Sequence, residues 1–450
     1  MKHVLMIAYD YPPRGWSGVQ RTAKLVRYLP RLDWEPVVLT VKEWYLPGVM
    51  DPSMLGEVEH AVTERTAMFT HEKFMRLWLD LGVVLTPFLK LAGKDAKWFA
   101  DGMRWRYIKW MCPDYACGWI LPAVLRGLKL IRQHRPSIIY STGPPWSDMV
   151  IGLILARLTG IRLVADFRDL WIDNFNPRPI AGWREWIDPK LEGAVVSCAA
   201  RTICTTESST ASIAEKYPRV PRTRFTTIFN GYDANDFPNS REVTRADATM
   251  TISHVGSLYG KQTPMYFLRA LESLVREEPS LRGQLRVRFI GHVEEFECEL
   301  RSSPCSDMIE TAGSVSHQQA VKDMVAADVL LLILGEGGEP VVPGKTFEYM
   351  ASNRPILATV PVRGEVAGML QEAGGAQVVD FNDVAAIAEA IGQLHAEWLN
   401  GGVQSGCSRE FVRRFERRRL AARMAEVFDE CVTTGFGRDK THRCGHHAPV

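Results

Sequence analysis

One stretch of the sequence decides the fold: Pro343-Gly344-Lys345-Thr346-Phe347-Glu348-Tyr349-Met350-Ala351-Ser352-Asn353-Arg354-Pro355. Residues 329–334 before it and residues 355–360 at its end are mostly apolar, as is typical of strands buried on both faces of a parallel sheet. Pro343 suits the first turn of a helix, and Pro355 prevents that helix from continuing. The sequence therefore predicts a strand, a glycine-rich loop, a short helix and a second strand.

We expect the start of this helix to bind an anion. Open parallel sheets bind ligands at the carboxyl ends of their strands, and a helix start offers unpaired N–H groups. Lys345 can meet the charge of a phosphate there, and Glu348 can accept hydrogen bonds from two hydroxyls of a ribose. A second interpretation of Glu348 stays open, in which its charge only complements the helix dipole.

The composition is that of an ordinary soluble protein. A chain of 450 residues is too long for one core and predicts two domains, and 46% of the residues are hydrophobic. The formal charge of +2 gives no general reason to expect a nucleic-acid partner. Nine scattered cysteines and a start without signal-peptide features predict reduced thiols and a cytoplasmic protein. No apolar run approaches the roughly 20 residues of a membrane-spanning helix.

The amino-terminal part predicts the same kind of sheet. A strand at 4–8, a helix at 19–32 and a strand at 36–41 form one right-handed unit. Gly15 and Gly18 follow the first strand and allow a ligand to approach the backbone closely. Their spacing is not that of a dinucleotide-binding loop, so a nicotinamide cofactor is not indicated.

Residues 51–122 interrupt this pattern and read as a helical, aromatic insert. Within it, residues 94–111 combine aromatic side chains at helical spacing with lysines and arginines. Such a segment can lie on an anionic membrane surface. It can equally pack against its own domain with the cations at the rim, and the sequence leaves both interpretations open.

A later strand of the first half ends in charged residues. Residues 162–165 form the strand, and Asp166, Arg168 and Asp169 follow it directly. Carboxylates around an arginine at this position can bind sugar hydroxyls or stabilise charge in a cleft. A structural ion pair is the alternative.

The second half repeats the arrangement after a polar linker. Strands at 251–255 and 285–290 are each followed directly by a glycine. Lys261 lies close enough to the first of these glycines in the sequence to reach a diphosphate. The candidate ligand contacts of these two loops are Gly256, Ser257, Lys261 and His292.

Two features near the carboxyl terminus receive the simpler interpretation. Residues 409–429 form an arginine-rich helix that we expect to pack with one solvated face, in preference to binding lipid or nucleic acid. The tail contains metal-ligand residue types, but its position favours disorder. Those tail residues are His442, Cys444, His446 and His447.

Taken together, these motifs resemble family 4 glycosyltransferases, which are retaining enzymes of the GT-B architecture. The resemblance is carried by YPPRGWSG at 11–18, STGPP at 141–145, ADFRDLW at 165–171, FNGYD at 229–233, HVGSLYGK at 254–261, FIGH at 289–292 and GKTFEYMASNRPIL at 344–357. It implies an α/β fold of two Rossmann-like, doubly wound parallel-sheet domains that face each other across a cleft. The expected parts are an acceptor-binding domain at 1–232, a nucleotide-sugar-binding domain at 233–408, a helix at 409–435 that packs back on the first domain, and a disordered tail at 436–450.

The resemblance also assigns residues. Glu348 matches the second glutamate of a paired motif that holds the ribose, whereas Pro340 stands where the first is expected and Glu339 is one position off. Ser257 replaces a frequent arginine, so Lys261 alone carries over as a diphosphate ligand from that loop. The candidate donor-binding residues are Gly15, Gly18, Gly256, Ser257, Lys261, His292, Gly338, Glu339, Gly344, Lys345, Thr346 and Glu348.

The implied chemistry is cleavage of a bond between a sugar and a diphosphate. Lysines and helix N–H groups would stabilise the leaving diphosphate, so that no metal or cofactor is expected. The catalytic candidates are Asp166, Arg168, Asp169 and Lys261. The expected partners are a nucleotide sugar and a glycan or polyprenyl-linked acceptor at the inner face of the cytoplasmic membrane. An epimerase of the same fold and a silent nucleotide-sugar-binding homologue remain as alternatives.

Overall fold

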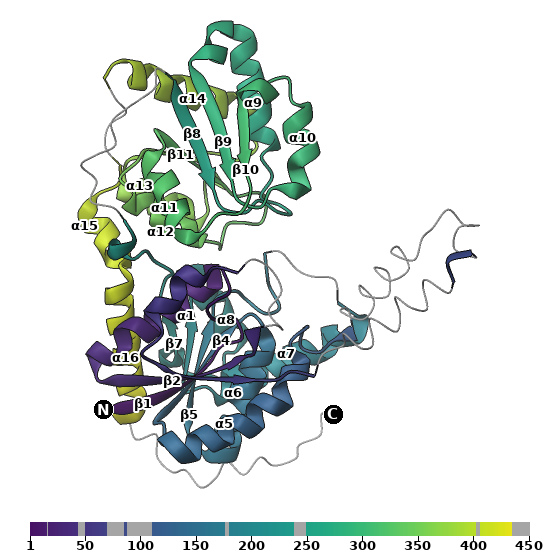
Figure 1. Ribbon diagram of the computed structural model, residues 1–450, viewed down its shortest axis with the longest axis vertical. Helices are drawn as coiled ribbons and strands as arrows, with labels where there is room; N and C mark the ends of the chain where they lie inside the picture. The colour runs from purple at the N-terminus through teal and green to yellow at the C-terminus, as the bar shows by residue number, and fades with distance from the viewer. Residues whose placement is uncertain are drawn as a thin grey trace.

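The computed structural model describes residues 1–15, 17–43, 50–69, 85–87, 110–175, 180–237, 249–401 and 406–433. They form two α/β domains, one above the other in Figure 1. Each domain is built on a parallel sheet with helices on both faces, which confirms the predicted GT-B class of fold.

The first sheet has seven strands in the order β3-β2-β1-β4-β5-β6-β7. Its strands are β1 (Lys2–Ile7), β2 (Trp34–Val41), β3 (Val62–Thr66), β4 (Ile138–Gly143), β5 (Arg162–Phe167), β6 (Arg201–Cys204) and β7 (Phe225–Thr227). Its helices are α1 (Ser17–Tyr28), α5 (Ile120–His134), α6 (Trp146–Thr159), α7 (Gly182–Cys198) and α8 (Glu207–Lys216), with short 3-10 turns that include η3 (Pro52–Glu57).

The second sheet has six strands in the order β10-β9-β8-β11-β12-β13. Its strands are β8 (Met250–Val255), β9 (Leu285–Ile290), β10 (Ile309–Ala312), β11 (Val329–Ile333), β12 (Ile356–Thr359) and β13 (Ala376–Val379). Its helices are α9 (Met265–Glu277), α10 (Glu297–Ser302), α11 (His317–Ala326), α12 (Gly344–Ala351), α13 (Glu365–Ala373) and α14 (Val384–Leu399).

The central strands show why these runs of sequence become buried sheet. On β1, Leu5 and Ile7 pack with α5 and α6, whereas Val4 and Met6 pack with α1 on the opposite face. This alternation follows from the two-residue period of a strand, and both faces bury apolar side chains because helices cover both. The decisive stretch behaves as predicted, since Pro343 precedes α12 and the chain leaves the helix before β12.

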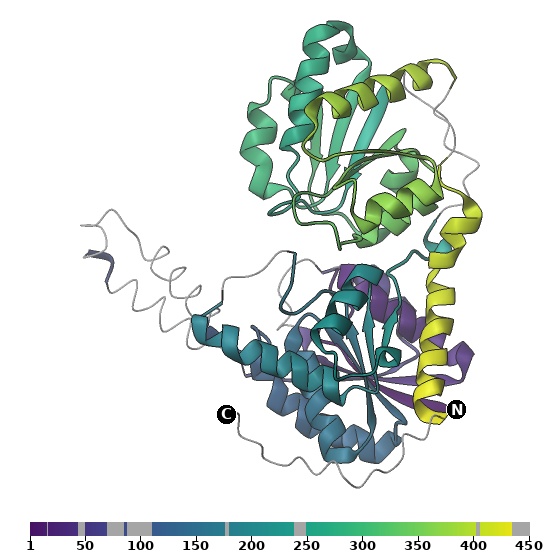
Figure 2. The ribbon, with the colours of Figure 1, turned by 180° about the vertical axis from the view of Figure 1, so that it is seen from behind.

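The chain returns to the first domain at its carboxyl end. Helix α15 (Arg409–Val412) and the turn η10 (Arg413–Phe415) lie against the second domain, and α16 (Arg417–Thr433) runs along the first, as the yellow helix in Figures 1 and 2 shows. Phe428 of α16 is fully buried, with its ring centroid 5.2 Å from that of Trp34 and 6.0 Å from that of Tyr140. This packing makes α16 part of the core of the first domain.

The structure corrects several expectations. Residues 62–66 form the edge strand β3 inside the expected helical insert, and the expected single helix at 409–429 is broken at Glu416. The break arises because Tyr232 bonds both sides of it: its N–H donates to Phe415 and its carbonyl accepts from the Arg417 N–H.

Two expectations fall largely outside the described residues. These are the membrane-surface interpretation of residues 94–111, of which only Trp110 and Met111 are described, and the metal-ligand types in the tail. Within the part of the chain that the structure describes, no helix combines the length and the apolar character needed to span a membrane.

Candidate active site

The carboxyl edges of the two sheets face each other. The ammonium group of Lys261, in the loop after β8, lies 5.8 Å from the ring centroid of Phe175 in the first domain. Thr206 Oγ1, after β6, donates to the Pro340 carbonyl at 3.1 Å. The loops that follow the strands of both domains therefore meet between them, where α/β proteins bind ligands.

The strands β8 and β9 end in a compact glycine corner. Gly256 and Gly291 have φ angles of +128° and +131°, and the Gly256 N–H donates to the Ile290 carbonyl at 2.7 Å. A Cβ atom on residue 291 would lie 2.6 Å from the Gly256 carbonyl oxygen. Only glycine fits both the backbone conformation and the space, so this corner presents bare backbone to a ligand.

Lys345 lies over this corner. Its Nζ atom lies 3.0 Å from Nε2 of His254, a wholly buried residue, and 3.4 Å from the Ser257 carbonyl oxygen. His254 Nδ1 is 2.9 Å from the Leu331 carbonyl, which can only accept, so Nδ1 carries the proton and Nε2 accepts from Lys345. Burial and the neighbouring Lys345 hold the pKa of His254 well below its ordinary value. Residue 345 as a whole is partly exposed, but burial of its ammonium end lowers its pKa to about 7.

Helix α12 is anchored so that its first turn faces the same corner. Tyr349 Oη accepts from the Val255 N–H at 2.7 Å and donates to the Val255 carbonyl at 3.0 Å. Gly344 is the first residue of the helix, and no atom lies within 4 Å of the position that a Cβ atom would occupy there. Thr346 Oγ1 is buried without a hydrogen-bond partner among the described residues. The arrangement leaves N–H groups, a hydroxyl and an ammonium group close to one another.

Glu348 is held by a residue that no motif in the sequence indicated. Its Oε1 atom lies 2.8 Å from Nε2 of His317, the first residue of α11, and the side chain is only 11% exposed. No described residue donates a hydrogen bond to Oε2 of Glu348. One carboxylate oxygen is thus fixed within the protein and the other is left for a ligand.

Lys261 lies against the glycine-rich loop at 335–338 of the second domain. A Cβ atom on Gly335 would lie 1.9 Å from the Lys261 carbonyl oxygen, and one on Gly337 would lie 3.3 Å from Lys261 Nζ. The Lys261 side chain is exposed and lies between this loop and Phe175 of the first domain.

The charged loop after β5 is used differently from our expectation. Asp166 is fully buried and accepts from Arg21 at 2.8 and 2.9 Å, and also from Tyr140 and Thr142. Burial would raise the pKa of Asp166, but Arg21 outweighs it and the pKa lies below its ordinary value. The alternative of a structural ion pair therefore describes Asp166, which no acceptor can reach in this arrangement.

Arg168 joins three loops of the first domain. Its guanidinium donates to the carbonyls of Gly18 and Pro144 and lies 3.3 Å from Asp10. Of the charged residues expected to meet an acceptor, Asp169 is the exposed one.

The remaining candidates are spread over the facing edges. Gly15, Ser257 and His292 are exposed, and His292 pairs with Glu294. Gly338 is buried in its loop, whereas Glu339 lines a second site: an interdomain cavity of about 650 Å³ that also includes Glu365. Nothing in the contacts of Glu339 brings it to Lys345, and so the structure does not place it with the anion-binding group. Among the described residues, no three His, Cys, Asp or Glu side chains gather as metal ligands.

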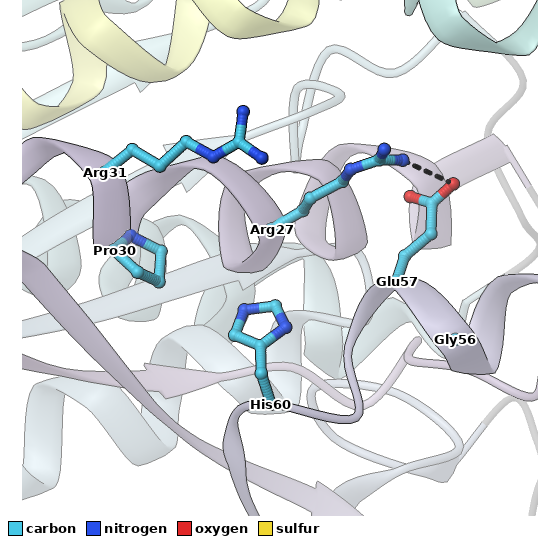
Figure 3. A pocket seen from close by; sticks show the side chains of 6 residues that line it. All are labelled: Arg27, Pro30, Arg31, Gly56, Glu57 and His60. Carbon is cyan, nitrogen blue, oxygen red and sulfur yellow. Dashed lines mark ion pairs between the residues drawn. The ribbon is translucent and has the colours of Figure 1, made fainter.

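A second cavity, of about 430 Å³, lies in the first domain beside α1. Figure 3 shows the ion pair of Arg27 with Glu57 at its border, with Arg31 in the 3-10 turn η1 (Leu29–Leu32) that follows α1, and His60 opposite. It is separate from the glycine corner and borders the charges between the domains.

Comparisons with known proteins agree with this architecture. Residues 11–231 match the model of a glycosyl transferase 4-like domain, and residues 249–397 match that of glycosyl transferases group 1. No curated protein matches the sequence.

Solved structures share the fold at low sequence identity. Anabaena Alr3699/HepE, solved with UDP and glucose, has a TM-score of 0.65 and 13% identity, covering 96% of this chain and 100% of its own. Sucrose-phosphate synthase from Thermosynechococcus elongatus has a TM-score of 0.62 and 15% identity, with 96% and 99% covered. WaaG, a glycosyltransferase of lipopolysaccharide biosynthesis, has a TM-score of 0.57 and 14% identity, with 94% and 99% covered. The two consecutive domain matches, on a fold of this kind, show that the chain belongs to the family 4 glycosyltransferases, enzymes of class EC 2.4 with the GT-B fold.

Proposed function

We propose that this protein is a retaining glycosyltransferase that moves a hexose from a nucleotide-diphosphate sugar to a glycan or lipid-linked acceptor in surface polysaccharide synthesis. The observation that carries the proposal is the glycine corner, over which Lys345 and the first turn of α12 converge. The donor binds to the second domain, and the acceptor to the facing edge of the first.

The diphosphate of the donor occupies the space beside Lys345. Its oxygens accept from the Gly344 N–H at the start of α12, whereas the side chain of Thr346 is wholly buried. Lys261, on the loop after β8 of the same domain, approaches from the side that faces the first domain. As the bond between the sugar and the diphosphate breaks, negative charge grows on the leaving oxygen, and these fixed positive groups stabilise it. The proposal uses no metal and no other cofactor.

The ribose of the donor binds to Glu348. His317 occupies Oε1, so Oε2 accepts from the ribose hydroxyls. Pro340 stands in place of the first glutamate of the paired motif, and backbone groups of the loop around Gly338 take over the contacts that this glutamate would make.

The acceptor lies against the loops that Arg168 joins. Gly18 leaves room for the Arg168 guanidinium, which a Cβ atom at this position would approach to 3.0 Å, and the exposed Asp169 accepts from the hydroxyls of the acceptor. Transfer with retention proceeds by attack of the acceptor hydroxyl from the face that the diphosphate leaves, and the leaving diphosphate takes up the proton. No protein nucleophile takes part in this scheme.

The relatives support a first choice of substrates to test. The Anabaena protein was solved with UDP and glucose, and WaaG acts in lipopolysaccharide biosynthesis. We therefore place the protein at the inner face of the cytoplasmic membrane and begin with UDP-glucose as donor.

The test is a panel of nucleotide sugars, assayed with and without lipid-linked and glycan acceptors. We expect acceptor-dependent release of nucleoside diphosphate, with an unchanged anomeric configuration of the transferred sugar by NMR. Lys345→Ala should abolish release, while Lys322→Ala, on the exposed side of α11, should keep it. Conversion of the donor to another sugar without acceptor would instead show an epimerase, and binding without turnover a silent homologue.

A further inference from the structure

His317 joins three parts of the molecule that are distant in sequence. Its side chain contacts Glu348 of α12, with Nδ1 3.9 Å from Asp236 in η6 (Ala234–Asp236), the segment that links the domains. Its backbone N–H donates to Asp51 Oδ2 of the first domain at 3.0 Å. The imidazole is 13% exposed. One residue therefore contacts a proposed ligand of the donor, the linker and the opposite domain.

Asp51 is itself fixed in place. Its Oδ1 atom accepts from the Ser53 N–H at 3.0 Å and from the Ser53 hydroxyl, which leaves Oδ2 for His317. The Asp51 carboxylate thus lies at the start of α11, where a negative charge is favourable. A shift of the first domain against the second would pull on the residue that holds Glu348.

We propose that His317 is the positioning residue of the donor site: it orients Glu348 toward the ribose and links that orientation to the seating of the two domains through Asp51 and Asp236. The proposal rests on the proposed function, in which Glu348 binds the ribose. It adds a residue that does not itself touch the donor, and it ties donor binding to the contact between the domains.

The charges around His317 favour its cationic form. Burial alone would lower its pKa, but the hydrogen bond and charge of Glu348 outweigh burial, with Asp236 adding to them, and the pKa lies above its ordinary value. The charged groups that face it are Glu348, Asp236 and Asp51, opposed by Lys24 of α1, and the buried Arg417 of α16 interacts with the same Glu348 and Asp236.

Lys24 belongs to a larger set of buried charges behind His317. Its ammonium lies 2.8 Å from Asp236, 2.9 Å from Asp233 and 2.7 Å from Glu57. Glu57 also pairs with Arg27 at the cavity in Figure 3, where this set meets the surface. The carboxylates of this set are shared among several cations. His317 is the member whose ordinary pKa lies nearest to neutral pH, so its charge is the one that changes there.

The test compares a nucleotide with its form lacking both ribose hydroxyls. We would measure dissociation constants of UDP and 2′,3′-dideoxy-UDP by calorimetry, using GDP or ADP and their dideoxy forms if either binds more tightly. In the wild type, the ribose hydroxyls should improve affinity at least about 10-fold, as expected for hydrogen bonds to a carboxylate. In His317→Ala this preference should fall to about 2-fold, with little change for the dideoxy form.

Two further variants separate positioning from structural support. The amide of the glutamine in His317→Gln can donate to Glu348 as Nε2 does, so this variant should keep most of the ribose preference. It also keeps the test valid if the alanine variant folds poorly. The wild-type preference should decrease as the pH rises through the raised pKa of His317 and the imidazole loses its proton, and it should not change with pH in the glutamine variant. His134→Ala, at the far end of α5, should behave as the wild type.

The link to the domain contact has its own variant. Asp51→Ala should reduce the ribose preference at least about 3-fold, as removal of one hydrogen bond on the backbone of His317 predicts, whereas the exposed neighbour Glu59→Ala should not. An unchanged preference in Asp51→Ala would overturn this link.

A full ribose preference in His317→Ala, or a wild-type preference independent of pH, would overturn the positioning role. If Glu348→Gln kept the wild-type preference while UDP still bound, the proposed ribose contact itself would fail. That result is distinct from failure at His317 alone.

Discussion

Binding of the donor should be coupled to the uptake of a proton by the protein, because the pKa of Lys345 lies close to neutral pH. Burial lowers its pKa to about 7 in the free protein. A diphosphate beside the ammonium group would stabilise the charged form and return the pKa toward the ordinary lysine value of about 10.4. His254 behind Lys345 is neutral and offers no negative charge to stabilise the ammonium group. The stabilising negative charge must therefore come from the ligand.

The size of the effect follows from proton linkage. With a free pKa of about 7, Lys345 is about 10% protonated at pH 8, so binding should take up about 0.9 of a proton there and about 0.1 at pH 6. The association constant should fall about 50-fold between pH 7 and pH 9, but only about 2-fold between pH 5 and pH 7.

Calorimetry in buffers of different ionisation enthalpy measures this uptake directly. A nucleotide sugar is the better ligand, because its diphosphate lacks the terminal phosphate group that titrates near pH 6. Lys345→Met keeps a side chain of similar length without the charge, and its proton uptake should be subtracted from that of the wild type. A constant affinity between pH 7 and pH 9, or equal uptake by Lys345→Met, would refute the reasoning.

Three further predictions concern the site and the fold. Glu348→Ala should abolish transfer without changing the circular dichroism spectrum, and full activity of the purified variant would contradict its assignment to the donor. Gly291→Ala should destabilise the protein by about 1–3 kcal/mol in urea unfolding, since it combines a strained φ with a contact of 2.6 Å, whereas Gly283→Ala, with open space around it, should lie within about 1 kcal/mol of the wild type. Phe428→Ala should cost about 3–5 kcal/mol because it empties the ring contact between α16 and the first sheet, and a change below about 1 kcal/mol would argue against that packing.

The sheet strands could be predicted from local patterns of apolar residues. Residues 329–334 are a short apolar run buried on both faces, whereas residues 285–290 alternate apolar side chains with Arg286 and Arg288, and both form strands close to the predicted bounds. The edge strand at 62–66 was not found, since Val62-Thr63-Glu64-Arg65-Thr66 is largely polar and only pairing with β2 makes it a strand. The break at Glu416 was missed because its cause is Tyr232, a residue nearly 200 positions away.

Only some residues of the site could be predicted, because only some of them are positioned by their neighbours in the sequence. Lys345 and Glu348 are close in sequence to the helix start that positions them, so local patterns indicated them. The roles of His254 and His317 depend on contacts between strands and between domains, which no local pattern contains. Asp166 looked like an acceptor contact because its partner, Arg21, lies 145 residues away.

The central claim is that the second domain binds the diphosphate of the donor at the start of α12. A crystal structure with a bound nucleotide sugar tests it most directly. We predict diphosphate oxygens within hydrogen-bond distance of Lys345 Nζ and of the Gly344 N–H, with the ribose at Glu348. A nucleotide bound only to the first domain, or a diphosphate remote from Lys345, would contradict the account.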